Sequence, residues 1–216
     1  MKKIGIKWKV EDMTSQKGKI AIVTGSNTGI GYQMALALAD KGAMVVLACR
    51  NLEKGEKARS DIIESSPGAL ITVEELDLAN LESIEAFGQR LVKSHGHVDI
   101  LINNAAVMAC PYGKTQDGFE LQFGTNHLGH FTFFKGLLPA LLNADYARVV
   151  CLSSTGHFLS PVVFDDIGFE HRDYEPWSSY GQAKTANALM ALGIQKRYAA
   201  QGIEAFAVHP GGIMTT

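Results

Sequence analysis

The stretch Thr24-Gly25-Ser26-Asn27-Thr28-Gly29-Ile30-Gly31 places three glycines in the spacing GxxxGxG. An apolar run at residues 20–24 precedes it, and a segment of helical period begins at Gly29. Glycines in a strand-to-helix turn let the backbone approach a pyrophosphate, whose charge is met by unpaired N–H groups and the helix dipole. The stretch therefore predicts a dinucleotide phosphate loop, against the alternative of a glycine-rich turn without a ligand. No GK[ST] sequence follows, which disfavours phosphoryl transfer.

Short apolar runs alternate with segments of helical period from residue 19 onward, as in parallel βαβ units. The runs are almost continuously apolar, as expected of strands buried on both faces. Strands are expected at residues 20–24, 44–48, 70–75, 100–103, 148–152 and 205–208. Helices are expected at residues 29–41, 52–65, 81–94, 119–142 with a break near Pro139, and 178–200. Residues 155–176 lack a period and predict a surface loop. The fold class is α/β: a doubly wound Rossmann fold with six parallel strands and helices on both faces.

Composition indicates an ordinary globular protein with a small-molecule partner. The 216 residues are 46% hydrophobic, and 20 Lys and Arg against 22 Asp and Glu leave a net charge of −2. We expect one dinucleotide-binding catalytic domain at residues 19–216, preceded by an N-terminal extension at residues 1–18. The charge balance gives no reason to expect nucleic acid. No apolar run is long enough to cross a bilayer and no signal peptide is recognisable, so a cytoplasmic location is expected.

The end of the second expected strand bears on the choice of cofactor. It reads Ala48-Cys49-Arg50-Asn51 and lacks the carboxylate that binds the ribose 2′-hydroxyl of NAD. The Arg50 guanidinium can pair with a 2′-phosphate instead. The sequence therefore predicts NADP(H) over NAD(H), which remains an option if Arg50 is only a solvated strand end.

Tyr180 and Lys184 are four residues apart, which places them on one face of the last expected helix. The preceding strand ends in Ser153 and Ser154, at the same edge of the sheet. Reduction of a carbonyl needs a proton donor, and an ordinary phenol has a pKa of about 10. We expect the Lys184 ammonium to lower the pKa of Tyr180, and Ser154 to hydrogen-bond the substrate oxygen.

These motifs together resemble the short-chain dehydrogenase/reductases over residues 19–216. The stretch from residues 47 to 55 is similar to the retinol-dehydrogenase-like branch. The resemblance implies that Asn126 holds a water in a proton relay with Lys184, and that Pro210-Gly211-Gly212-Ile213-Met214-Thr215 receives the nicotinamide amide. The expected cofactor site comprises Gly25, Ser26, Asn27, Thr28, Gly29, Ile30, Gly31, Arg50, Asn51, Asp77, Leu78, Asn104, Ala105, Tyr180, Lys184, Pro210, Gly211, Ile213 and Thr215.

The expected activity is NADP(H)-dependent interconversion of a carbonyl and a primary or secondary alcohol. We expect a lipophilic small-molecule substrate, no metal, and a homodimer as one option. The resemblance also implies a seventh strand and a substrate lid beyond Thr216, so the chain is expected to be truncated. Two alternatives stay open: an inactive NADP(H)-binding regulatory module or fragment, and an S-adenosylmethionine-dependent methyltransferase, which leaves Tyr180 and Lys184 unexplained.

Overall fold

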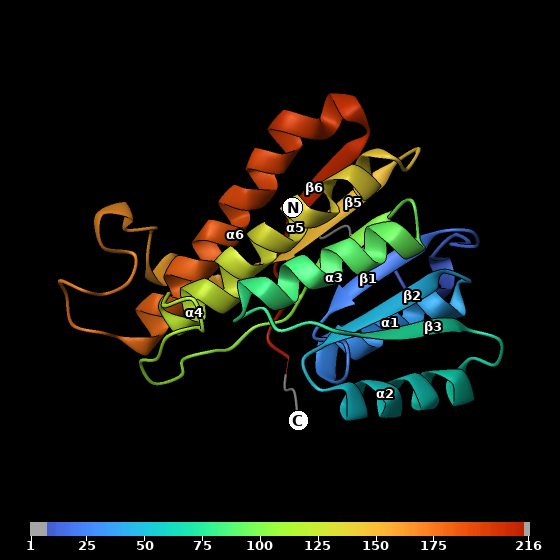
Figure 1. The fold of residues 1–216 in the computed structure, drawn as a ribbon, viewed down its shortest axis with the longest axis horizontal. Coiled ribbons are helices and arrows are strands. Elements are labelled where there is room, and N and C mark those ends of the chain that lie inside the picture. The colour runs from blue at the N-terminus through green and yellow to red at the C-terminus, as the bar shows by residue number, and fades with distance from the viewer. Residues whose placement is uncertain (1–7, 214–216) are drawn as a thin grey trace, which may run out of the picture.

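A six-stranded parallel sheet forms the centre of the structure (Figure 1). The computed structural model describes residues 8–213. Every neighbouring pair of strands is parallel, in the order β3-β2-β1-β4-β5-β6. The strands are β1 (Ile20–Thr24), β2 (Met44–Cys49), β3 (Leu70–Glu75), β4 (Ile100–Asn103), β5 (Ala147–Leu152) and β6 (Ile203–Val208). The sequence-predicted fold class is confirmed.

Helices cover both faces of this sheet. They are α1 (Gly29–Asp40), α2 (Leu52–Ser65), α3 (Leu81–Ser94), α4 (Leu121–Phe123), α5 (Gly129–Leu142) and α6 (Pro176–Tyr198). The core under α3, α5 and α6 includes the edge-to-face pair Phe87 and Phe133, whose ring centroids are 4.9 Å apart. A second core lies under α1 and α2 and contains Ala35 and Ile62. Among residues 8–213, no helix is both long and apolar enough to span a membrane.

The strand order reverses at β1, because the chain builds β2 and β3 on one side of it and then returns to place β4 on the other. In such sheets ligands bind at the carboxyl ends of the strands beside this reversal. The register pairs Thr24 of β1 with Ala48 of β2, and Asn103 of β4 with Cys151 of β5. The loops that follow these strands therefore meet at one edge of the sheet.

The helix predicted at residues 119–142 is divided differently from the expectation. Its first part is the short α4 followed by a π-helical turn at Gly124–Leu128, and α5 then continues to Leu142 through Pro139. The break expected near Pro139 was wrong, because Ala140 and Leu141 are fully buried and their packing holds the last turn in place.

Other boundaries also differ from the prediction, and β6 begins at Ile203 instead of residue 205. Helix α6 begins at Pro176 because the Glu175 carboxylate accepts the N–H groups of Trp177 and Ser178. The expected loop at residues 155–176 contains 3-10 helices at Thr155–Leu159 and Phe164–Asp166.

Candidate active site

A cleft of about 820 Å³ opens at the carboxyl ends of β1, β2, β4 and β5. This volume is within the range of small-molecule and cofactor sites. Most of the predicted site residues line it: Gly25, Asn27, Thr28, Gly29, Ile30, Gly31, Arg50, Asp77, Leu78, Asn104, Ala105, Ser154, Tyr180, Lys184, Pro210, Gly211 and Ile213. Sequence reasoning thus identified both the loop at one end of the cleft and the ionisable pair at the other.

The start of α1 faces the cleft without a side-chain cap. Thr28 makes no capping hydrogen bond in the described part of the chain, and the first turn carries no acidic residue. The first N–H groups of a helix have no acceptor within the helix, and they lie at the positive end of its dipole. By contrast, side chains cap α2, α3 and α6. The start of α1 is therefore suited to an anion such as a pyrophosphate.

Glycine is required in this loop on steric grounds. Gly25 and Gly29 have φ values of +63° and +58°. A Cβ on Gly31 would collide with the Gly25 carbonyl oxygen and lie 2.6 Å from Asn104 Nδ2. The backbone itself therefore forms the wall of the cleft, which is the fit that a dinucleotide phosphate requires.

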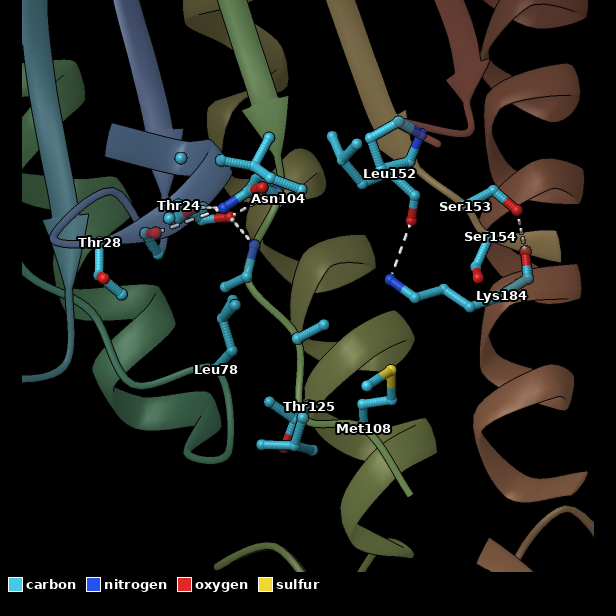
Figure 2. Close-up of a pocket in the computed structure, with 18 of the residues that line it drawn as sticks. Thr24, Thr28, Leu78, Asn104, Met108, Thr125, Leu152, Ser153, Ser154 and Lys184 are labelled. Carbon is cyan, nitrogen blue, oxygen red and sulfur yellow. Dashed lines mark hydrogen bonds between the residues drawn. The ribbon is translucent and has the colours of Figure 1, made fainter. Parts of the chain in front are cut away.

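The turn after β4 is fixed to the end of β1 (Figure 2). Asn104 Nδ2 donates to the Thr24 carbonyl oxygen at 2.9 Å. The backbone N–H groups of Asn104 and Ala105 both donate to Thr24 Oγ1, at 2.9 and 3.0 Å. The Asn104-Ala105-Ala106 turn and the glycine loop consequently form one unit.

Arg50 and Asp77 lie on the β2 and β3 side of the cleft. Arg50 is exposed, and no acidic side chain within residues 8–213 forms an ion pair with it. Asp77 Oδ1 accepts the N–H group of Ala79 at 2.9 Å, while Leu78 is buried. The Arg50 guanidinium can therefore receive an anionic ligand without breaking an existing pair.

At the other end of the cleft, Tyr180 and Lys184 are both buried, and Ser154 Oγ accepts the N–H group of Gly156 at 3.1 Å. Lys184 Nζ lies 5.4 Å from the centroid of the Tyr180 ring and donates to the Leu152 carbonyl oxygen at 3.1 Å (Figure 2). Burial lowers the pKa of Lys184 to about 8. At neutral pH this ammonium therefore keeps its charge in most molecules.

The pKa of Tyr180 differs from the expectation. Burial raises it, and a hydrogen bond with the Ser154 hydroxyl only partly offsets this rise. The predicted net lowering of the Tyr180 pKa is therefore wrong, because desolvation of the phenol outweighs the opposing effects and the Lys184 ammonium donates to the Leu152 carbonyl. The Tyr180 phenol is therefore protonated at neutral pH and can act as an acid.

Asn126 does not line the cleft. It is completely buried, and its side-chain amide exchanges two 2.8 Å hydrogen bonds with the backbone of Val107. Its carbonyl oxygen accepts from His130 Nδ1 at 2.9 Å and from Asn187 Nδ2 at 3.1 Å. Asn126 therefore braces the loop after β4 from the π-helical turn.

His130 belongs to the same buried network and was not among the predicted site residues. Its Nε2 lies 2.9 Å from Thr24 Oγ1, which already accepts two backbone N–H groups and so donates its own proton to the ring. Burial lowers the pKa of His130 to about 3, so the ring is neutral. The spacing of four residues from Asn126 was the available sequence signal.

Three other predicted cofactor residues are not placed in the cleft. Ser26 is buried and does not line it, and the Asn51 side chain caps α2 by accepting the Lys54 N–H group. Thr215 lies outside the described residues. The cleft has additional lining residues that sequence reasoning missed, among them Val107, Met108, Thr125 and His209. Within residues 8–213, no three His, Cys, Asp or Glu side chains are grouped closely enough to hold a metal ion.

Comparison with known proteins agrees with this geometry. The family model described as short chain dehydrogenase matches residues 19–216. The chain belongs to the short-chain dehydrogenase family. Its sequence is 44% identical to retinol dehydrogenase 12 of Mus musculus over 198 residues, which are 92% of this chain and 62% of that protein. It is 44% identical to human retinol dehydrogenase 13 over 90% of this chain and 59% of that one. The chain thus spans about three fifths of the length of these curated relatives.

Solved structures of this family share the fold. An uncharacterized protein from Mycobacterium paratuberculosis has a TM-score of 0.84 and 40% identity, covering 94% of this chain and 72% of its own. A short chain dehydrogenase from Shigella flexneri, solved as a complex with NADP, has a TM-score of 0.75 and 28% identity, with 93% and 80% coverage. This family member is similar to retinol dehydrogenases in sequence and to an NADP complex in fold.

Proposed function

We propose that this protein is an NADP(H)-dependent oxidoreductase that interconverts a carbonyl and a primary or secondary alcohol. One observation carries the proposal: the buried Tyr180, with Lys184 beside its ring, shares a cleft with Ser154 and the uncapped start of α1. A phosphate-binding helix end and a proton donor in one cleft meet the two needs of carbonyl reduction.

The roles of the side chains follow from their positions. The start of α1 and Arg50 would hold the dinucleotide, whose nicotinamide would supply hydride-transfer chemistry. Tyr180 donates its phenolic proton to the oxygen of the forming alcohol, and in the reverse direction it accepts that proton. Ser154 hydrogen-bonds the same oxygen and stabilises the charge that develops on it. Lys184 holds a positive charge beside the phenol, which stabilises the phenolate left after proton transfer.

The first test is turnover of Tyr180→Phe. The phenylalanine ring keeps the packing against Trp177, whose ring centroid is 6.2 Å away, and removes only the hydroxyl. Reduction of a panel of lipophilic aldehydes and ketones should fall about 10²- to 10⁴-fold, while NADPH binding, followed by energy transfer from tryptophan, stays unchanged. Unchanged turnover would exclude Tyr180 from the reaction. NADPH binding without turnover in the wild-type chain would favour the regulatory module instead.

The preference for NADP(H) rests on Arg50, an exposed guanidinium without an acidic partner among residues 8–213. In Arg50→Ala, NADPH affinity should fall about tenfold with little change in NADH affinity, because only NADPH carries the 2′-phosphate. Arg59→Ala on α2 is the control, since Arg59 is paired with Glu56. Equal losses for both dinucleotides would contradict the role of Arg50.

A lipophilic substrate, a homodimer and a cytoplasmic location belong to the same proposal. Apolar Val107 and Met108 in the cleft support the substrate class. An apolar groove of about 550 Å³ between α5 and α6, lined by Phe131 and Leu189, supports a dimer contact. Light scattering of the purified chain and fractionation of cells test the assembly and the location.

A further inference from the structure

Asn187 lies on α6 three residues after Lys184 and is almost completely buried. Its Nδ2 donates to the Asn126 carbonyl oxygen at 3.1 Å and to the Leu152 carbonyl oxygen at 3.2 Å. The Leu152 oxygen is also the acceptor of Lys184 Nζ, at 3.1 Å. One amide group therefore connects the π-helical turn to the end of β5, whose Leu152 carbonyl oxygen also accepts from the lysine ammonium.

The orientation of this amide is determined by its surroundings. Asn187 Oδ1 lies 3.1 Å from His127 Nδ1, which donates when that nitrogen carries the proton. Rotating the amide by 180° would place its oxygen against two carbonyl oxygens and its NH₂ group against the imidazole. The His127 ring is itself packed against Phe123, with centroids 5.1 Å apart. His127 therefore holds the Asn187 amide with both hydrogens toward the carbonyls.

The Lys184 ammonium depends on this arrangement because few groups are near it. The ionisable side chains that face it are Tyr180 from its own helix, Cys151 from β5 and His130 from α5. His130 is neutral, and burial raises the pKa of the Cys151 thiol to about 11. No carboxylate within residues 8–213 forms an ion pair with Lys184. A carbonyl oxygen in a fixed position therefore stabilises its charge.

We propose that Asn187 is a positioning residue for the reaction: its amide fixes the Leu152 carbonyl and so sets the position of the Lys184 ammonium beside Tyr180. The inference rests on the proposed function for its catalytic meaning. Its structural content, the dependence of Lys184 on Asn187, can be measured without turnover. Asn187 does not line the cleft, so it acts through Lys184 and not on the substrate.

The test compares Asn187→Leu with Gln182→Leu. Leucine has the same branched arrangement of side-chain heavy atoms as asparagine and removes both hydrogen-bonding functions. Gln182 is an equally buried amide on the same helix, but it does not contact the Leu152 carbonyl. Its hydrogen-bond partners are the backbone of Val163 and Ile167 and the Arg172 guanidinium. The pKa of Lys184 is followed by NMR of the full chain labelled in its lysine side chains. It should fall by at least about half a unit in Asn187→Leu and stay unchanged in Gln182→Leu.

Kinetics provide the second measurement. In Asn187→Leu, kcat should fall about tenfold and its alkaline limb should move to lower pH, with the Kd for NADPH within about threefold of wild type. An unchanged Lys184 pKa in Asn187→Leu would overturn the proposal. A lowered Lys184 pKa in Asn187→Leu, combined with no turnover by the wild-type chain, would support the positioning role and overturn the proposed function. The two failures are therefore distinct.

A second pair of variants applies if Asn187→Leu does not fold. His127→Phe keeps the aromatic packing with Phe123 but removes the donor that orients the Asn187 amide. It should lower the Lys184 pKa in the same direction by a smaller amount. His127→Gln keeps an N–H donor at this position and should leave the Lys184 pKa at its wild-type value. Identical Lys184 titrations in both variants would contradict the proposed arrangement.

Discussion

At the start of α1 the cleft presents backbone N–H groups, whereas at the end of β5 it presents side chains. The backbone end depends on Gly31, which has no Cβ, and on Thr28, whose side chain makes no capping hydrogen bond within residues 8–213. The second end depends on buried polar groups that are paired, such as Lys184 with the Leu152 carbonyl. The comparison shows that one cleft can combine an unsatisfied backbone site with a satisfied side-chain network.

The largest expected effect is at the backbone end. Gly31→Val would force a side chain against the Gly25 carbonyl and Asn104, which are both fixed. NADPH binding should fall more than about 100-fold, and the chain should be less stable, because neither neighbour can move without breaking the loop. Fluorescence titration and urea unfolding measure the two effects.

The control for this change is Gly136→Ala in α5, where an added Cβ meets no atom within 4 Å. It should stabilise the protein by up to about 1 kcal/mol through helix propensity and leave NADPH binding unchanged. Full NADPH binding by Gly31→Val would show that the loop does not approach the phosphate.

At the side-chain end, Lys184→Met should change the pH dependence of stability. The folded pKa of Lys184 is about 8 and its ordinary value is 10.5, so between these values the unfolded chain holds the proton and the folded chain releases it. The free energy of unfolding of the wild type relative to Lys184→Met should therefore rise by roughly 3 kcal/mol from pH 8 to pH 10.5.

Urea unfolding of both proteins at several pH values in this window gives that difference directly. Lys196→Met removes an exposed lysine from the same helix and serves as the control. A difference between wild type and Lys184→Met that does not depend on pH would mean that burial of the Lys184 ammonium carries no free-energy cost.

The smallest effect is expected from Thr28→Asp, which places a charged side chain at the backbone end of the cleft. Thr28→Asp supplies α1 with a side-chain cap of the kind that α2 and α3 have, and it adds a negative charge where the phosphate is expected. The variant should gain about 0.5 to 1 kcal/mol in stability and bind NADPH about tenfold more weakly.

Asn80→Ala is the complementary change, because the Asn80 side chain caps α3 by accepting the Ser83 N–H group. It should lose about 1 kcal/mol of stability with NADPH binding intact. Tighter NADPH binding by Thr28→Asp would contradict an anion site at the start of α1.

The sequence could predict those parts of the cleft that short stretches of the chain encode. The loop from Thr24 to Gly31 and the pair Tyr180 and Lys184 are encoded by local spacing, so their chemistry and the strand ends that carry them were predictable. The apolar run of β5 also gave the place of Ser154, directly after the end of that strand.

The supporting network was not predictable, because it joins distant parts of the chain. Thr24 and His130 are 106 residues apart, and Asn187 is 35 residues from Leu152. The π-helical turn that carries Asn126 lies inside the segment 119–142, whose apolar residues have helical spacing. The rise in the pKa of Tyr180 likewise reflects burial, which no local spacing encodes.

The free N–H groups at the start of α1 are the proposed binding site of the cofactor phosphates. NMR of the ¹⁵N-labelled chain during NADPH titration tests it directly. The amide resonances of Gly29, Ile30 and Gly31 should shift strongly and saturate with the fluorescence-derived Kd, while Ser83, whose N–H group is already donated to Asn80, shifts less. Saturating NADPH that leaves these three α1 amides unchanged would contradict the account.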